Sequence, residues 1–308
     1  MVTGFVGTLV GVIRALLSLE AVGLVPPVLS AAASLVAIAA PGNALAPALG
    51  IAAALALLAT TARSWRTSRR PALALLGLAA AAWAIGDALW LREGPGGAAT
   101  AWWMAFAALA ITGQRVDTDP RLGDKGRPLL AIAVLLILLG ALAVAAHASE
   151  GLRAFGLGAV ALAAWAVRAD LVERWRHVGS RAYLRFFALA LASAYLWLAV
   201  SGGLALVVGA AAYDAIVHAL FAGFVLSAIF AHAPAFVPGV LGRAVVFRAT
   251  AYIPLALLDL AVLWRVIATL RASTEGQRWS SLLIGLAVLL FVVNTTASLR
   301  SRRPLLAT

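Results

Sequence analysis

Residues 129–147 read LLAIAVLLILLGALAVAAH, eighteen uncharged and mostly aliphatic residues followed by one histidine. As an α-helix this stretch would rise about 28 Å, close to the ~30 Å thickness of the hydrocarbon core of a bilayer. Similar apolar stretches recur from one end of the chain to the other, and none alternates apolar and polar residues as a half-buried strand would. Because only helices and closed barrels satisfy their backbone hydrogen bonds in lipid, the sequence predicts an all-α, polytopic transmembrane helical bundle.

The composition excludes several classes of protein. Of 308 residues, 64% are hydrophobic and 12% are charged, with a mean hydropathy of +1.00, which leaves too few charges for the surface of a soluble protein. The chain has no cysteine, so disulfides, thiolate metal sites, iron–sulfur clusters and covalent c-type haem are excluded. The net charge of +12 is assigned to basic loops that face anionic lipid headgroups, and no nucleic-acid partner is expected.

The apolar stretches predict about eleven helices in one integral membrane domain that covers residues 1–308. Turn residues separate them, as in Pro41-Gly42, the Gly94–Gly97 segment and Pro120. The fifth stretch is short for a membrane span, and its helix is expected to extend into the residues on either side. The expected spans are 2–22, 24–40, 44–62, 71–91, 100–114, 129–147, 153–171, 184–208, 213–233, 247–268 and 279–298.

The distribution of basic residues predicts the orientation. If the loop from Arg63 to Arg70 is cytoplasmic, nineteen of the 24 Lys and Arg residues lie on the cytoplasmic side and five lie on the other. Cytoplasmic loops are enriched in Lys and Arg, so the C-terminus is predicted to be cytoplasmic. An odd number of helices then leaves the N-terminus outside.

Three of the four histidines, His147, His218 and His232, lie in or beside the expected spans, where a polar side chain needs a partner or a function. His177 lies in a basic loop and is expected to be solvated. His218 and His232 are fourteen residues apart on one helix, a rise of about 21 Å, so one metal ion cannot bridge them. A four-histidine di-haem site would need a second helix with such a pair, and this chain has none. A single haem bound by His218 and His147 stays open, and the alternative is a histidine that bonds to a neighbouring helix.

Two carboxylates also lie within expected spans. Asp259 is in the middle of its span, and Asp87 is near the outer end of another. A carboxylate in lipid is a candidate proton or cation site. The alternative for either residue is a structural salt bridge to Arg14 or Arg265.

Two blocks of sequence resemble the signatures of a group of bacterial membrane proteins that is distantly similar to the NnrS family. The first is DAIVHALFAGF at residues 214–224, continued by IFAHAP at residues 229–234, and the second is MVTGFVGTL at residues 1–9. The resemblance implies about twelve helices in a layout similar to the catalytic subunit of haem–copper oxidases. It also implies haem b or copper as cofactor, with His218 as the first candidate ligand and His232 as the second. The location it implies is the bacterial cytoplasmic (inner) membrane.

The chain departs from the pattern of that group at its start. The group usually has one more helix upstream, which ends in His-Gly, and an acidic residue where this chain has Ile13. We expect either that the chain starts at an internal methionine or that this member lacks one ligand. An upstream helix ending in His-Gly would place its histidine at the membrane level expected for His218.

These features support three functional hypotheses. The first is a haem- or metal-binding membrane protein that acts in redox or nitric-oxide stress chemistry. The second is a secondary transporter that uses Asp259 or Asp87 as an intramembrane carboxylate, although no inverted repeat is visible. The third is a non-catalytic membrane partner subunit. In each hypothesis the protein lies in the lipid bilayer, and its candidate partners are another membrane protein or a second copy of the chain.

Overall fold

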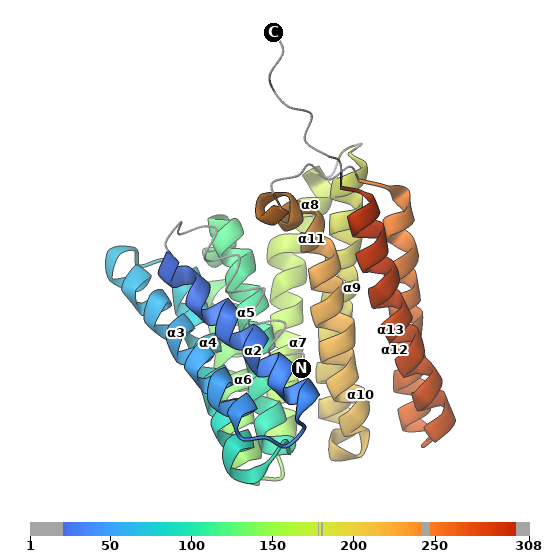
Figure 1. The fold of residues 1–308 in the computed structure, drawn as a ribbon. Helices are drawn as coiled ribbons and strands as arrows, with labels where there is room; N and C mark the ends of the chain where they lie inside the picture. The colour runs from blue at the N-terminus through green and yellow to red at the C-terminus, as the bar shows by residue number, and fades with distance from the viewer. Residues whose placement is uncertain (1–20, 178, 180, 242–246, 300–308) are drawn as a thin grey trace. The chain divides into compact units, whose positions relative to one another are not determined.

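The computed structural model describes residues 21–177, 179, 181–241 and 247–299, and these residues form helices joined by short loops, without a β-sheet (Figure 1). The expected all-α class is therefore confirmed for this part of the chain. The first expected helix, residues 2–22, lies almost entirely outside the described residues, and so do the signature at residues 1–9 and Arg14. The other ten expected spans each coincide with a helix.

The chain divides into two compact units, and each is described by itself. Unit 1 comprises residues 1–165 and 202–211, and unit 2 comprises residues 166–201 and 212–308. The expectation of a single membrane domain stays a prediction. The helices up to α7 are α2 (Val25–Ala39), α3 (Leu45–Thr67), α4 (Pro71–Glu93), α5 (Gly97–Thr118), α6 (Arg127–Ala145) and α7 (Gly151–Ala166). The later helices are α8 (Val172–His177), α9 (Ala182–Val207), α10 (Tyr213–His218), α11 (Leu226–Leu241), α12 (Tyr252–Leu270) and α13 (Thr274–Ala297).

Two of the long helices contain π-helical segments. Segment η3 (Val167–Leu171) joins α7 to α8, and η5 (Ala219–Val225) joins α10 to α11, so each assembly is one continuous but irregular helix. Short 3₁₀ turns, η1 (Ala21–Leu24), η2 (Pro120–Gly123), η4 (Gly209–Ala212) and η6 (Ala249–Ala251), occur at helix ends. Both π-helical segments belong to unit 2. Such segments are rare and are frequent at functional sites.

Eight helices of the described part are long and apolar enough to cross a membrane, and the chain is therefore a multi-pass membrane protein in contact with a lipid bilayer. Helix α2 is apolar but shorter. Helix α5 covers residues 97–118, so the short fifth stretch does extend into its flanks as expected. Almost every residue of α5 from Ala99 to Val116 is buried, and its polar residues are thus shielded within unit 1.

Small residues and turn residues explain the local geometry of unit 1. Pro71 begins α4, and Gly94, with a φ of +84°, ends it. Helices α6 and α7 approach backbone to backbone, because a Cβ atom added at Gly140 would lie 2.3 Å from the backbone nitrogen of Phe155. Glycine allows this approach, which is the usual basis of helix association in lipid. Helices α2, α3, α4 and α5 pack successively against one another (Figure 1).

Candidate functional site

The carboxylate of Asp259 lies halfway along α12 and is half-buried in unit 2. Ser193 Oγ donates a hydrogen bond of 2.5 Å to Asp259 Oδ1, and the indole N–H of Trp197 donates one of 2.9 Å to the same oxygen. Ser193 Oγ also lies 3.1 Å from Ser227 Oγ, which is fully buried. Since Ser193 gives its proton to the carboxylate, Ser227 is the donor to Ser193. The carboxylate therefore has only neutral donors among the described residues, all on Oδ1.

The position of Trp197 depends on a glycine in the π-helical segment η5. A Cβ atom at Gly223 would lie 2.4 Å from Trp197 Cγ, so no larger residue fits there while the indole keeps its place. Ser193 and Trp197 are four residues apart on α9 and lie on one face of it. This face, Gly223 and Asp259 form one packed polar layer that joins α9, η5 and α12.

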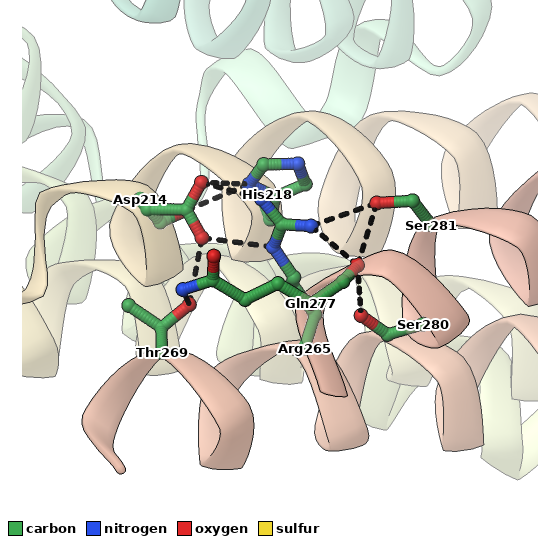
Figure 2. Close-up of polar contacts among 7 residues, drawn as sticks. All are labelled: Asp214, His218, Arg265, Thr269, Gln277, Ser280 and Ser281. Atoms are coloured by element: carbon green, nitrogen blue, oxygen red, sulfur yellow. Dashed lines mark hydrogen bonds and ion pairs between the residues drawn. The ribbon is translucent and has the colours of Figure 1, made fainter. Parts of the chain in front are cut away.

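Asp214 forms the second polar cluster of unit 2, shown in Figure 2. Arg265 pairs with it through both nitrogens of one edge, Nε to Oδ2 at 2.8 Å and Nη2 to Oδ1 at 2.7 Å. Thr269 Oγ1 donates a further hydrogen bond of 2.6 Å to Oδ2. The other edge of the guanidinium group donates to the backbone oxygen of Gln277 at 2.8 Å and to Ser281 Oγ at 2.7 Å. Arg265 thus ties α10, α12 and α13 together, and its charge is balanced by Asp214.

His218 lies beside this ion pair, one helical turn after Asp214. Its Nδ1 lies 2.8 Å from the backbone oxygen of Asp214 and 3.3 Å from Oδ1 of the same residue. A neutral imidazole that donates its Nδ1 proton to a carbonyl presents Nε2 as an acceptor, and this is the arrangement of most metal-binding histidines. The ring is about one-third exposed within the structure.

His232 lies near the middle of α11, fourteen residues after His218 in the same irregular helix, and contacts aromatic rings. Its Nδ1 lies 2.7 Å from the backbone oxygen of Ala228. Its ring centroid is 5.0 Å from that of Phe187 and 6.0 Å from that of Phe236. The guanidinium group of Arg174 lies over the ring of Phe187, 4.6 Å from its centroid. The rings of Phe187 and Phe236 thus lie beside the imidazole of His232.

A third acidic residue of unit 2, Asp170, is on the π-helical segment η3 and is 3% exposed. Arg174 Nη2 forms an ion pair with it at 3.0 Å, and the hydroxyl of Tyr195 donates to it at 2.7 Å. Asp170 and Asp214 therefore each have an arginine as partner. Asp259 differs from both, because its donors among the described residues, Ser193 and Trp197, are uncharged.

The two remaining candidates belong to unit 1. Asp87 on α4 is 2% exposed and accepts a hydrogen bond of 2.8 Å from the indole N–H of Trp103. The carboxylate fills the space left by Gly50, where a Cβ atom would lie 1.9 Å from Asp87 Oδ2. His147 lies two residues after the end of α6, is exposed, and has a left-handed φ of +57°.

No group of three or more metal-binding side chains occurs in the described part of the chain. Single histidines with a fixed tautomer are present, and His218 is one that a haem iron could use as an axial ligand. His147, its expected partner, is in unit 1 and His218 is in unit 2, so a haem held by both stays a prediction. The clearest feature of the site is the carboxyl group of Asp259, which lies half-buried in an apolar helix and accepts hydrogen bonds from a hydroxyl and an indole.

Sequence reasoning identified Asp259 but not its neighbours. The suggested salt bridge partner, Arg265, binds Asp214 instead. The spacing of Asp214 and His218, four residues apart on one helix face, could have indicated that they share a site. Ser193 and Trp197 have the same spacing, but nothing in the sequence connects α9 with α12, so their contact with Asp259 appears only in three dimensions.

Comparison with known proteins adds the family. The family model described as domain of unknown function DUF8744 matches residues 1–300. No curated protein and no solved structure matches the chain. Since the match covers nearly the whole sequence, this multi-pass membrane protein belongs to the family of domain of unknown function DUF8744.

Proposed function

We propose that the protein is a secondary transporter in which Asp259 binds the coupling proton. The observation that supports this proposal is the pairing of charges in unit 2. Arg265, six residues after Asp259 on α12, forms an ion pair with Asp214, while the donors to Asp259 among the described residues are all neutral. A carboxylate in a membrane is costly unless a cation neutralises it, and a proton does so at no steric cost.

The hydrogen bonds also indicate where the proton binds. Both donors, Ser193 and Trp197, point to Oδ1 of Asp259, and Oδ2 accepts no hydrogen bond from the described residues. A proton on Oδ2 therefore leaves both existing hydrogen bonds intact. Protonation removes the charge of the layer, and release restores it, so the occupancy of Oδ2 changes how strongly α12 is held against α9.

The irregular helices of unit 2 favour a transport role. Transporters commonly place their ion sites beside interrupted membrane helices. Here η5 lies directly beside the Asp259 layer, because Gly223 of η5 packs against Trp197. Segments of π-helix are frequent at functional sites, and Gly223 leaves the space in which the indole of Trp197 reaches Asp259.

Reaction with dicyclohexylcarbodiimide tests the proposal without knowledge of the substrate. The protonated carboxyl group adds across the reagent and rearranges to a stable N-acylurea, which mass spectrometry of peptides locates. We expect the adduct at Asp259, formed faster at lower pH, in the purified protein and in an Asp170→Asn control. Absence of an adduct at Asp259 at every pH at which the protein is folded would contradict the proposal.

A second candidate function, haem or metal binding with a role in redox or nitric-oxide stress chemistry, is favoured by one observation. The bond from His218 Nδ1 to the Asp214 carbonyl leaves Nε2 as the ligand atom. A haem would supply redox chemistry there, with His218 holding the iron. A Soret band in the purified protein that disappears in His218→Ala and persists in His177→Ala would support this function. Absence of a Soret band and of bound copper would exclude the haem or metal function. The transporter and the partner subunit would then be the two remaining hypotheses.

The proposed location is the bacterial cytoplasmic membrane, with the C-terminus on the cytoplasmic side. The excess of basic residues in the Arg63–Arg70 and Arg115–Arg127 loops supports this orientation.

A further inference from the structure

One carboxyl group of unit 1, that of Asp87 on α4, is almost completely enclosed by protein. The residue is 2% exposed, and glycines bring its neighbours close to it. A Cβ atom at Gly50 of α3 would lie 1.9 Å from Asp87 Oδ2. A Cβ atom at Gly86 would lie 2.6 Å from Cδ1 of Trp103, so the indole of Trp103 lies directly on α4 beside the carboxyl group. The carboxyl group is therefore held between α3 and an indole of α5.

The hydrogen-bond donors to Asp87 are neutral. The indole N–H of Trp103 donates to Oδ1 at 2.8 Å, and the indole of Trp83, one turn earlier on α4, is a second donor. Arg92, the basic residue in the last turn of α4, is 73% exposed and pairs with Glu93. Among the described residues, Asp87 thus accepts hydrogen bonds from indoles and forms no ion pair.

Two other enclosed carboxylates show how this chain neutralises a buried charge. The side chain of Asp117 is 6% exposed and lies 3.1 Å from Arg70 Nη1, and that of Asp170 is 3% exposed and lies 3.0 Å from Arg174 Nη2. A buried carboxylate without a cation is so costly that the group takes up a proton instead. Asp87 has no arginine among the described residues, so it needs a different cation.

The space around Asp87 selects that cation. A metal ion needs several oxygen ligands at about 2 Å or more, and its charge would repel the indole N–H groups that point at the carboxyl group. A proton needs no space and keeps the indole hydrogen bonds. With Oδ1 bonded to Trp103, the proton belongs on Oδ2, the oxygen that faces Gly50. We propose that Asp87 holds a proton permanently in the folded protein and is a neutral acid between α3, α4 and α5.

The proton is permanent because the ionised form of Asp87 has nothing to stabilise it. Asp259 is half-buried, so part of its carboxyl group can exchange a proton with its surroundings. At Asp87, 2% exposed, loss of the proton would leave a charge that only indole dipoles solvate. A proton that never leaves cannot be the one that a transporter carries. Asp87 thus belongs to the static framework of unit 1, and its proton has the role of a structural ligand.

Infrared spectroscopy of the purified protein tests the proposal, because a protonated carboxyl group has an acid C=O stretching band and an ionised one has carboxylate bands instead. The spectrum of the wild type minus that of Asp87→Asn isolates this group. We expect the acid band with equal intensity at an acidic and at an alkaline pH at which the protein is folded. Asp124→Asn is the matched control, since Asp124 is 70% exposed and pairs with Arg127, and its difference spectrum at alkaline pH should contain carboxylate bands only.

A second variant keeps the test decisive if Asp87→Asn does not fold. Trp103→Phe removes the donor to Oδ1 and leaves the carboxyl group in place, so the acid C=O band should move to higher frequency. The proposal is overturned if Asp87→Asn removes carboxylate bands, if the acid band disappears at alkaline pH, or if Trp103→Phe changes carboxylate bands only. The same comparisons in an Asp259→Asn background should give the same result, so the outcome does not depend on the proposed transport function.

Discussion

The substitution Gly223→Ala should disturb the Asp259 site without touching the carboxylate. The added methyl carbon would lie 2.4 Å from Cγ and 2.8 Å from Cδ2 of Trp197. Carbon atoms in contact are about 3.5–4.0 Å apart, so the indole must move by about 1 Å. Such a shift stretches the 2.9 Å bond from Trp197 Nε1 to Asp259 Oδ1 beyond hydrogen-bonding distance.

The magnitude follows from three contributions. Overpacking costs about 1–3 kcal/mol, and the lost hydrogen bond to the carboxyl group costs about 1–3 kcal/mol. The better helix propensity of alanine offsets up to about 1 kcal/mol. The free energy of unfolding should therefore fall by about 3 kcal/mol, which lowers the melting temperature by roughly 6 °C in a chain of this size.

Thermal unfolding of the purified protein, followed by tryptophan fluorescence, measures the effect. Gly285→Ala is the control, because a Cβ atom at Gly285 of α13 meets nothing within 4 Å. The double variant Gly223→Ala/Trp197→Leu should recover part of the loss, since the smaller side chain relieves the overlap. The reasoning is refuted if Gly223→Ala melts at the temperature of Gly285→Ala and forms the carbodiimide adduct at the wild-type rate.

Three further predictions concern the rest of the chain. Gly50→Ala should destabilise the protein strongly, since the added Cβ would lie 1.9 Å from Asp87 Oδ2, and Asp87→Ala in the same chain should restore stability; equal melting of both variants would contradict this packing. Arg265→Gln should lower the free energy of unfolding by about 1–3 kcal/mol by leaving Asp214 without its partner, and adding Asp214→Asn should reduce that loss, as a double-mutant cycle will measure. A cysteine in place of Thr308 should resist an impermeant thiol reagent added outside intact cells, and rapid labelling would reverse the proposed orientation.

Much of the fold follows from the sequence because the bilayer restricts the choices. An apolar stretch such as residues 129–147 must be a helix in lipid, and turn residues set the ends of such helices, as Pro71 and Gly94 do for α4. The π-helical segments could not be foreseen, since one extra residue per turn leaves no pattern in so apolar a sequence. Segment η5 nonetheless decides where Gly223 meets Trp197.

The candidate site was predictable residue by residue but not as an arrangement. An aspartate in the middle of an apolar helix identifies Asp259, because its cost in lipid demands an explanation. The hydrogen-bond partner of Asp259 could not be deduced from the sequence. Arg265 is close in sequence but binds Asp214, whereas Ser193 is sixty-six residues away and donates to Asp259. Only the packing of α9 against α12 shows that Asp259 bonds to Ser193 and not to Arg265.

The protonation of Asp259 within the folded protein is the central claim, and infrared difference spectroscopy between low and high pH measures it directly. A protonated carboxylic acid has a C=O stretching band that shifts in D₂O and disappears on ionisation. We predict such a band in the wild type and in Asp87→Asn, and its loss in Asp259→Asn, where the amide keeps the hydrogen bond from Trp197. A titrating band that survives unchanged in Asp259→Asn would contradict the claim.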